Sequence, residues 1–554
     1  MDSPKITVRA LTKRAHFLWS HWKITLLVLV LAFAAWFLRP LWQPAAVFLR
    51  VHLFEWVAAL AVLVFLVRSV ALRRWWPDFT AGCLVVASWL FVLYGLNVSP
   101  YDYVCLYSRY VSVERQDMSS LPETAHERVQ PLNSVRTLSN EVLDDTVDAA
   151  EPDVVRVGDS YRFTFAIEPS KEFFFRRWSE PVRELMSLPV TSPSFDFSSK
   201  SREKVLFQAG EGLAMVRNVK SAVVRSFGPI RFWSYEPADV KYLKDDSGEW
   251  VQVVPLIHWR GFLAPWPDFG GVVIIRQHQG GLMSKISTAL FGTGEWVRPE
   301  DVPKKPFLVG QNIVPYDVSR YAAESFRFKA GFWSPAVGHW GDIRIPDMPE
   351  DKNPQPYTVF ATWDGEQGKL WHYFGLEPWA KDKQGLALSL FVPADGVGSV
   401  RVVSHDDQGL FGVSTVPAKV RESKKIFDWR GNAPVEHRPF IRTVAGKRRL
   451  FWLTTIVTFK KGGDGDFIAG AKPEITFMDA ASQEVVWAAS GNPSSWLPQL
   501  EENIRANEAE HAPPKAPAPK DPSPEPPKAP EVPPVQAPPA EPKPKAPEPP
   551  AAQP

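Results

Sequence analysis

Three apolar runs lie almost end to end in the first hundred residues, and they limit what the chain can fold into more than any other feature. They cover Ile24–Leu38, Val51–Val67 and Thr80–Leu96. A bilayer core about 30 Å thick needs roughly 20 mostly apolar helical residues, and each run reaches this length once its aromatic flanks are counted. The sequence therefore predicts a three-helix transmembrane anchor carrying one large soluble portion, with spans at 24–39, 51–70 and 79–97.

The charges beside these runs predict the orientation of the anchor. Residues 1–23 contain five basic residues and a single acidic one. The first run is followed by Arg39 and Pro40 and by no small-residue cleavage site, which indicates an uncleaved helix rather than a signal peptide. Basic flanks face the cytoplasm. We therefore expect residues 1–23 to be cytoplasmic, and three crossings then put the main domain on the extracytoplasmic, periplasmic side of a bacterial inner membrane.

Tryptophan side chains mark the expected membrane interfaces. Their amphipathic rings favour the headgroup layer, so tryptophans that flank the runs are predicted to hold the helices in place, with the lipid bilayer as the partner. Glu55, near the start of the second run, is interpreted as a residue that extends toward the headgroups rather than as an ion site. The predicted interface residues are Trp19, Trp22, Trp36, Trp42, Trp75 and Trp76.

Charge and cysteine content exclude several classes of protein. A net charge of +2 over 554 residues gives no support for a basic face, so nucleic acid is not an expected partner. The two cysteines, Cys83 and Cys105, lie in and just after the third run, and two are too few for a disulfide-stapled scaffold of this length. Neither forms a CxxC motif or a Cys/His cluster. We therefore expect no cofactor and no zinc or redox site.

Residues 98–150 are predicted to be a juxtamembrane segment. The aromatic stretch 101–117 is expected to lie along the membrane surface or to enter the first strand. After Pro131, apolar residues recur every three to five positions, which predicts an amphipathic helix that packs on the domain or pairs with a copy of itself. Its apolar positions are Leu132, Val135, Leu138, Val142 and Val147.

A period-two pattern begins near residue 153 and predicts a β-rich α+β portion. Asp153–Ile167 alternates apolar and polar residues around a Gly-Asp turn. The basic aromatic sequence FFFRRW, Phe173–Trp178, is expected to open a short helical stretch through Met186. Its rings either touch lipid headgroups or form a half-buried cluster. We divide the soluble portion into a first part, 151–345, and a second part, 346–510.

Two stretches, 237–276 and 439–487, share an order of features. Each reads as a turn, a long β-branched strand, a Gly-containing loop and a second strand, and a helical segment follows each one, at Val318–Phe328 and Trp496–Ala506. Few residues are identical between the two stretches. The pattern indicates either a duplicated strand-loop-strand-helix unit or two similar units of independent origin. The α+β class is expected in both cases.

Two histidines stand beside aspartates in loops, where functional groups are common and where a carboxylate can orient an imidazole. His339 is followed by Asp342 and Asp347 in a Gly/Pro-rich loop, and His405 is followed by Asp406 and Asp407. Neither spacing matches a metal motif such as HExxH. We therefore expect no metal site, and the candidate catalytic residues are His339, Asp342, His405 and Asp406.

Other motifs give little support for an enzyme. His258 and His372 fall in predicted strands beside tryptophans, which favours half-buried sheet residues. Lys461–Asp466 has the composition of half a calcium loop but lacks the third ligand position and the closing glutamate, so a hairpin tip accounts for it. Neither a GxSxG elbow nor a nucleotide-binding glycine pattern in its required context occurs. The sequence leaves enzymatic activity open but favours a non-enzyme.

The C-terminal tail, 511–554, consists almost entirely of Pro, Ala, Lys and Glu. It has nothing to bury, so it is predicted to be disordered, and at full polyproline II extension some forty residues span on the order of 130 Å. Its composition resembles the Pro/Lys/Glu spacers of TonB-like energy-transducing proteins, although no globular tip follows it. That resemblance implies a spacer or docking role, including contact with a cell-envelope polymer. The alternative is a solubilising tail.

These features lead to one main hypothesis and two alternatives. The first is a membrane-anchored, non-catalytic envelope protein whose Trp-rich α+β domain serves protein assembly or scaffolding, through a protein partner or self-association. The second is an enzyme acting on envelope substrates, such as a glycan or lipid hydrolase. The third is a ligand-binding sensor or transport subunit.

Overall fold

The computed structural model of the chain comprises two compact units, Met1–Asn503 and Ile504–Pro554. The boundary falls within the last described helix, α14 (Trp496–Glu510). The predicted tail, 511–554, lies outside the described residues. The structure describes residues 22–71, 82–83, 100–195, 197, 201–277, 282–348, 355–380, 382–444, 446–462, 465–488 and 492–510.

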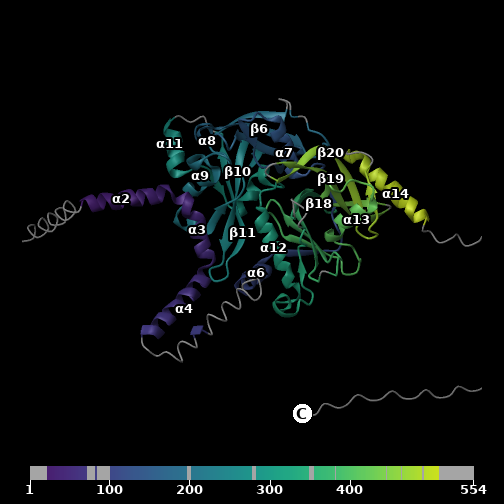
Figure 1. The fold of residues 1–554 in the computed structure, drawn as a ribbon, viewed down its shortest axis with the longest axis horizontal. Coiled ribbons are helices and arrows are strands. Elements are labelled where there is room, and N and C mark those ends of the chain that lie inside the picture. The colour runs from purple at the N-terminus through teal and green to yellow at the C-terminus, as the bar shows by residue number, and fades with distance from the viewer. Residues whose placement is uncertain are drawn as a thin grey trace, which may run out of the picture. The chain divides into compact units, whose positions relative to one another are not determined.

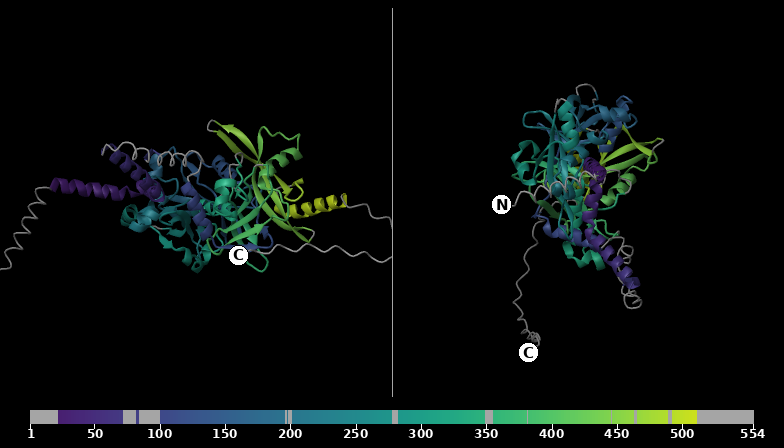
Figure 2. Two further views of the ribbon diagram at one scale, coloured as in Figure 1. Left: turned by 90° about the horizontal axis from the view of Figure 1, so that it is seen from below. Right: turned by 90° about the vertical axis from the view of Figure 1, so that its left-hand side faces the viewer.

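The chain begins with a run of three described helices, α2 (Trp22–Phe37), α3 (Arg39–Val51) and α4 (Leu53–Ala71). Among the described residues, no single helix combines the length and hydropathy needed to cross a bilayer, whereas α2 and α3 together meet that test across a bend of 76°. Figure 1 shows this bend, and in the left view of Figure 2 α2 is the purple helix that runs away from the sheets. Of the third predicted span only residues 82–83 are described, so it is not tested here.

The second feature of this region is that α3 packs against the folded domain. It lies beside α9 (Val219–Ser226) and β10 (Trp250–Arg260) in Figure 1, and it contacts α10 (Pro229–Ser234). Ala46 belongs to a core cluster built mainly from strands and from α9. The segment expected to be a loop between two spans is therefore a helix fixed to the domain.

The domain is a mixed α and β fold with several sheets, and two of them come from its first part. One has the order β3-β5-β6-β7, with β4 also paired to β5, and the other has the order β12-β11-β10-β8, with β9 also paired to β10. Their pairings are antiparallel, as expected for strands joined by short turns. The strands are β3 (Val147–Ala149), β4 (Asp153–Val157), β5 (Ser160–Pro169), β6 (Val182–Pro189), β7 (Arg202–Phe207), β8 (Tyr235–Pro237), β9 (Lys241–Lys244), β10, β11 (Trp266–Arg276) and β12 (Glu295–Val297).

Two further sheets follow. One has seven strands in the order β1-β17-β16-β15-β14-β2, with β13 paired to β15, and the other has the order β18-β19-β20-β21. The pairing of β1 with β17 is parallel and joins the start of the domain to a strand far along the chain. The strands are β1 (Arg115–Met118), β2 (Glu123–Ala125), β13 (Ile343–Arg344), β14 (Tyr357–Thr362), β15 (Lys369–Pro378), β16 (Leu388–Pro393), β17 (Val400–Ser404), β18 (Asn432–Val444), β19 (Lys447–Gly462), β20 (Gly465–Asp479) and β21 (Val485–Trp487).

Short helices connect and cover these sheets. The α helices not yet named are α6 (Pro100–Ser112), α7 (Leu132–Val142), α8 (Phe174–Ser179), α11 (Leu282–Phe291), α12 (Tyr316–Glu324) and α13 (Val416–Ser423), and α12 continues into the 3₁₀ helix η5 (Ser325–Ala330). Core clusters of large aromatic and β-branched side chains fill the space between elements, as close packing requires.

The hydrophobic period predicts the strands better than the helices. The long strands expected within 237–276 and 439–487 are confirmed as β10 and β19. The helix expected after Pro131 is present but ends at Val142, and Val147 starts β3 instead. The helical stretch expected through Met186 is wrong, because α8 ends at Ser179 and Met186 lies in β6. Apolar residues spaced by three to five positions fit a helix turn and a strand face equally well over short stretches.

Two predictions about domain organisation stay predictions. The stretches 237–276 and 439–487 each contain an antiparallel strand pair with one register shift, β10 with β11 and β19 with β20, but they belong to different sheets. This shared arrangement of strands does not test whether one stretch arose by duplication of the other. The same holds for the division between 151–345 and 346–510.

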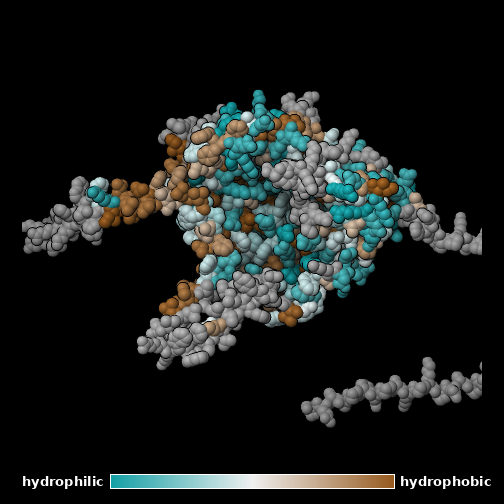
Figure 3. Space-filling model, in the orientation of Figure 1, coloured by the Kyte–Doolittle hydropathy of each residue, from teal (hydrophilic) through white to brown (hydrophobic). Residues whose placement is uncertain are grey.

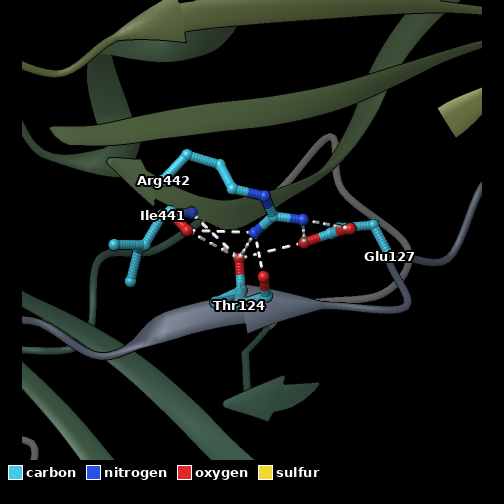
Figure 4. Close-up of polar contacts among 4 residues, drawn as sticks. All are labelled: Thr124, Glu127, Ile441 and Arg442. Carbon is cyan, nitrogen blue, oxygen red and sulfur yellow. Dashed lines mark hydrogen bonds and ion pairs between the residues drawn. The ribbon is translucent and has the colours of Figure 1, made fainter. Parts of the chain in front are cut away.

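A network of charged hydrogen bonds fastens the start of the domain to β18. Arg442 Nη2 lies 2.7 Å and 2.8 Å from the two carboxylate oxygens of Glu127, and Arg442 Nη1 donates to Thr124 Oγ1 at 2.9 Å (Figure 4). The Ile441 N–H also donates to Thr124 Oγ1, at 2.9 Å. One guanidinium nitrogen pairs with both carboxylate oxygens, and both side chains are mostly buried, so the ion pair ties together residues more than 300 positions apart.

Replacing Arg442 by Lys tests this network. An ammonium group keeps the charge but cannot bond Glu127 through one nitrogen and Thr124 through another, so we expect the free energy of unfolding to fall by about 1–3 kcal/mol. Urea titration of the detergent-solubilised protein measures it. Arg320→Lys is the matched control, because Arg320 pairs with Glu324 at an exposed position on α12; equal losses in both variants would contradict the role of Arg442.

Candidate functional site

The predicted pair His339 and Asp342 forms a cluster of ion pairs. His339 Nδ1 lies 2.9 Å from Asp342 Oδ2, and Arg327 Nη2 lies 3.1 Å from the same oxygen. The imidazole is stacked on the ring of Trp379 with centroids 3.8 Å apart. Arg327 thus compensates the charge of the buried Asp342 carboxylate, and Trp379 and Asp342 orient the His339 ring. Within the described part of the chain, the hydrogen bond of the His339 ring goes to this carboxylate and not to a nucleophile.

The second predicted pair is divided between the interior and the surface. His405 is buried, with Nε2 2.9 Å from Ser389 Oγ, and burial lowers the pKa of its imidazole. Asp406 is exposed and accepts from Ser404 Oγ at 2.7 Å. Neighbours in sequence therefore point to different environments. Among the described residues, no group of three or more His, Cys, Asp or Glu side chains is arranged to hold a metal ion.

A buried polar chain surrounds His372, which the sequence indicates only as a half-buried strand residue. Its Nδ1 lies 2.7 Å from Ser319 Oγ and its Nε2 lies 2.8 Å from Asn312 Oδ1. The side-chain order Ser-His-Asn has the form of a catalytic triad. Ser319 and His372 are fully buried, however, and burial lowers the pKa of His372 to about 3, so this neutral ring satisfies hydrogen bonds inside the core.

Next to this chain lies a buried ion pair between two sheets. Lys241 Nζ in β9 is 2.5 Å from Asp153 Oδ1 in β4, and both side chains are almost fully buried. The ammonium group also lies 5.2 Å from the ring centroid of Tyr316, which hydrogen-bonds to Asn312 and so joins the two networks. These groups lock the sheets together rather than forming an open site.

A group of carboxylates lies beside Gly210 and Gly212. The backbone N–H of Glu211 donates to Glu168 at 2.8 Å, and any Cβ at Gly212 would collide with that carboxylate. Burial, and then the neighbouring charge of Asp239, raise the pKa of Glu211 to about 8. Glu211 is therefore largely protonated at neutral pH, which explains why it can share this site with the carboxylates of Glu168 and Asp239.

The raised pKa of Glu211 predicts a specific pH dependence. A folded-state pKa above the unfolded value contributes stability that is complete below about pH 4.5 and is lost as the pH rises through 8. Glu211→Gln mimics the protonated acid and should remove this pH-dependent part of the stability. Between pH 5 and pH 8, the melting temperature of the wild type should therefore fall more than that of the variant. Glu474→Gln, on an exposed side chain, is the control; parallel profiles for Glu211→Gln and the wild type would contradict the prediction.

The described cavity with the most suitable lining for a ligand lies between α6 and the β10–β11 hairpin. It encloses about 320 Å³ and is lined by Arg109, Arg260, Trp266 and Asp268 on one side. Asp268 lies 3.2 Å from Arg109 Nη1 and 2.8 Å from Arg260 Nε. Burial lowers the pKa of Arg109, an effect that Asp268 partly offsets. Glu114 also lines the cavity, so its two guanidinium groups are balanced by two carboxylates, and the half-exposed Arg260 is the group best placed to pair with a ligand.

The opposite wall of this cavity is apolar. It comprises side chains from β11, α12, β16 and β17, and the turn at Gly396 closes it. Gly396 has φ +70°, and a Cβ there would approach the Phe269 ring to 2.5 Å. No sequence motif indicates this site, because Arg109 and Arg260 are separated by about 150 positions and only the packing of α6 on the hairpin brings them together.

The predicted interface tryptophans stay a prediction. Trp22 and Trp42 are exposed, Trp36 is half-buried, and Trp42 packs edge-on against Phe232 with centroids 4.5 Å apart. Trp19, Trp75 and Trp76 lie outside the described residues. Comparison with known proteins identifies no relative: no family model, no curated protein and no solved structure matches this chain.

Proposed function

We propose that this chain is a membrane-anchored, non-catalytic envelope protein that presents its domain outside the cytoplasm for assembly. Its anchor comprises α2, α4 and the run at 79–97. The apolar side chains of α2 are exposed along the helix, and those described in α4 are exposed as well. Such surfaces are unfavourable in water and favourable in lipid.

The observation that carries this proposal is the contact between the ends of the segment that contains α4. The chain leaves α3 at Val51 and re-enters the domain at α6, and Tyr101 Oη donates to the Val51 carbonyl at 3.3 Å. A segment whose ends meet crosses a bilayer an even number of times. Two crossings, by the runs at 51–70 and 79–97, agree with this contact.

The same contact supports the expected orientation. Because α3 packs on the domain, both lie on one side of the membrane, and α2 then carries the chain to the other side. Residues 1–23, with their five basic side chains, belong in the cytoplasm by the positive-inside rule. The domain and the tail are accordingly extracytoplasmic.

A surface for a protein partner is provided by α8. Its Phe175 side chain is 83% exposed, and Phe174 and Trp178 are also exposed. Aromatic residues are enriched in the centres of protein interfaces, and an exposed group of this size is uncommon on an isolated domain. The Pro-rich tail extends the reach of the domain toward a partner or a cell-envelope polymer.

Topology reporters test the proposal directly. One reporter active only outside the cytoplasm and one active only inside are fused after Pro77, Asp148 and Pro554. We expect the first position to report inside and the other two outside. A domain that reports inside would overturn the orientation, and an untethered, soluble protein would overturn the anchor.

Assembly is tested by crosslinking in cells and by the mass of the purified protein in mild detergent. Phe175→Ser should weaken a crosslinked complex while leaving the melting temperature unchanged, because the side chain is exposed. Ile426→Ser is the control at another exposed apolar position. A monomer that crosslinks to nothing would contradict an assembly role.

A second candidate function, a ligand-binding subunit, is favoured by the cavity of Arg109 and Arg260. It predicts that a small anion able to pair with the half-exposed Arg260 raises the melting temperature, because binding stabilises the native state. Inorganic phosphate is the first probe, and Arg260→Ala should abolish the rise. An unchanged melting temperature at every phosphate concentration up to that of the buffer salt would count against an anion site.

A further inference from the structure

The helix α3 exposes its largest apolar side chains, whereas the face that it buries against the domain combines one polar residue with two smaller apolar ones. Gln43, Ala46 and Val47 face the domain and are buried, whereas Leu41 is 70% exposed and Phe48 is 53% exposed. Gln43 is buried because its amide donates to the Tyr235 carbonyl at 2.6 Å. Ordinary amphipathic helices bury their large apolar side chains and expose the polar ones.

Neighbouring elements continue this exposed apolar surface. Arg50 Nη1 donates to the Trp259 carbonyl at 3.0 Å, which holds the end of α3 against the β10–β11 hairpin. The tip of that hairpin carries Phe262 and Leu263, each more than two-thirds exposed. On the other flank, α10 exposes Ile230 and Trp233. We call the seven residues of this surface the α3 face: Leu41, Phe48, Leu49, Ile230, Trp233, Phe262 and Leu263.

We propose that the α3 face rests in the headgroup and upper acyl layer of the same bilayer that holds the anchor. This inference rests on the proposed function and adds a fixed orientation of the domain on the membrane. Brown, apolar surface extends along α2 in Figure 3, and α3 follows α2 directly in the chain. A helix joined at both ends to apolar helices cannot move far from the lipid that surrounds them.

The charges beside the face fit a lipid surface. Arg50 and Arg260 flank the hairpin tip, and Arg39 lies at the start of α3, where its guanidinium carbon is 4.6 Å from the Trp36 ring centroid. Basic side chains and tryptophan rings at the depth of the headgroups stabilise an interfacial helix, particularly where anionic lipids are present. A second protein copy would need a complementary surface, whereas lipid covers any apolar shape.

The experiment measures contact with lipid at single positions. The full chain with Cys83→Ser keeps only Cys105, which is buried, and receives one new cysteine for an environment-sensitive nitrobenzoxadiazole label. The test positions are Phe48→Cys and Phe262→Cys, the control in the domain is Ile426→Cys, which is fully exposed, and the control in the anchor is Leu27→Cys. The labelled proteins are placed in nanodiscs of phosphatidylcholine and phosphatidylglycerol, with and without doxyl-labelled lipids that quench the probe.

We expect probes at positions 27, 48 and 262 to emit at shorter wavelengths and to lose most of their fluorescence to the doxyl lipids, while the probe at 426 keeps its fluorescence. Quenching at 27 without quenching at 48 and 262 would overturn the α3 face but leave the anchor intact. A blue shift at 48 and 262 without lipid quenching would instead indicate cover by a second copy and also overturn the proposal. No quenching at 27 would overturn the proposed function and this inference together.

Discussion

Glu436→Ala should lower the free energy of unfolding by about 3–5 kcal/mol, because it leaves two cations buried without their carboxylate. Glu436 is fully buried, and Arg128 Nη2 lies 2.7 Å from its Oε2. Arg438 Nη1 lies 3.8 Å from the same oxygen. Burial lowers the pKa of Arg438 to about 10 while Glu436 opposes that shift, so the cation depends on this partner.

The carboxylate also accepts a backbone hydrogen bond. The N–H of Leu132, at the start of α7, donates to Glu436 Oε1 at 3.0 Å, so the residue joins β18 to α7 as well. Glu436→Gln keeps an acceptor for this N–H and should cost less than Glu436→Ala. The backbone of Glu436 has φ +52°, and Ala and Gln experience the same strain there.

Urea titration of the detergent-solubilised variants measures these losses, and the double variant Glu436→Ala with Arg128→Met separates their causes. Removing one of the two unpaired cations should restore part of the lost stability. The control is Glu366→Ala, whose ion pair with Arg401 is about half exposed on the carboxylate side. A loss for Glu436→Ala no larger than about 1 kcal/mol, the range of surface pairs, would contradict the prediction.

Trp452→Ala is expected to have an effect of similar size through packing. Trp452 in β19 is fully buried, and its ring centroid lies 6.1 Å from that of Tyr373 in β15. The indole N–H donates to the Phe411 carbonyl at 3.0 Å. The side chain therefore connects the sheet of β18–β21 to the seven-stranded sheet, and its removal leaves a cavity and an unpaired carbonyl.

The expected loss for Trp452→Ala is about 3–5 kcal/mol, the usual range for a large aromatic side chain removed from a core. Trp452→Phe should cost less, because it fills most of the space but still loses the bond to Phe411. Trp333→Ala is the control, since this tryptophan is largely exposed. Equal unfolding midpoints for Trp452→Ala and Trp333→Ala would show that the two sheets do not depend on this contact.

The candidate site illustrates the limit of sequence motifs. His339 and Asp342 are close in sequence and prove to be in contact, because a three-residue separation in a tight loop lets the side chains meet. His405 and Asp406 are adjacent and yet lie in different environments, because β17 ends at Ser404 and the chain turns toward the surface directly after His405. Proximity in sequence therefore predicts contact only when the local backbone allows it.

Much of the β structure follows from sequence patterns alone. Strands such as β10 and β19 are long, rich in β-branched residues and bounded by turns, and these local properties are enough to predict them. Helices shorter than three turns, such as α8, offer too few residues for a helical period to be distinguished from a strand. The prediction of the anchor likewise depends only on the lengths of the apolar runs. A bilayer sets the length that is needed, and these lengths can be read directly from the sequence.

The sequence by itself determined the apolar runs, the mixed α and β class and the principal strands, because each depends on residues near one another in the chain. Tertiary structure alone decided that α3 packs on the domain, that Val51 meets Tyr101 and that Arg109 and Arg260 share Asp268 on one wall of a cavity. It also decided which charges are buried: neither Glu436 nor Lys241 differs in sequence from a surface residue. Burial and long-range pairing arise from the whole packing of the chain, and no local pattern encodes them.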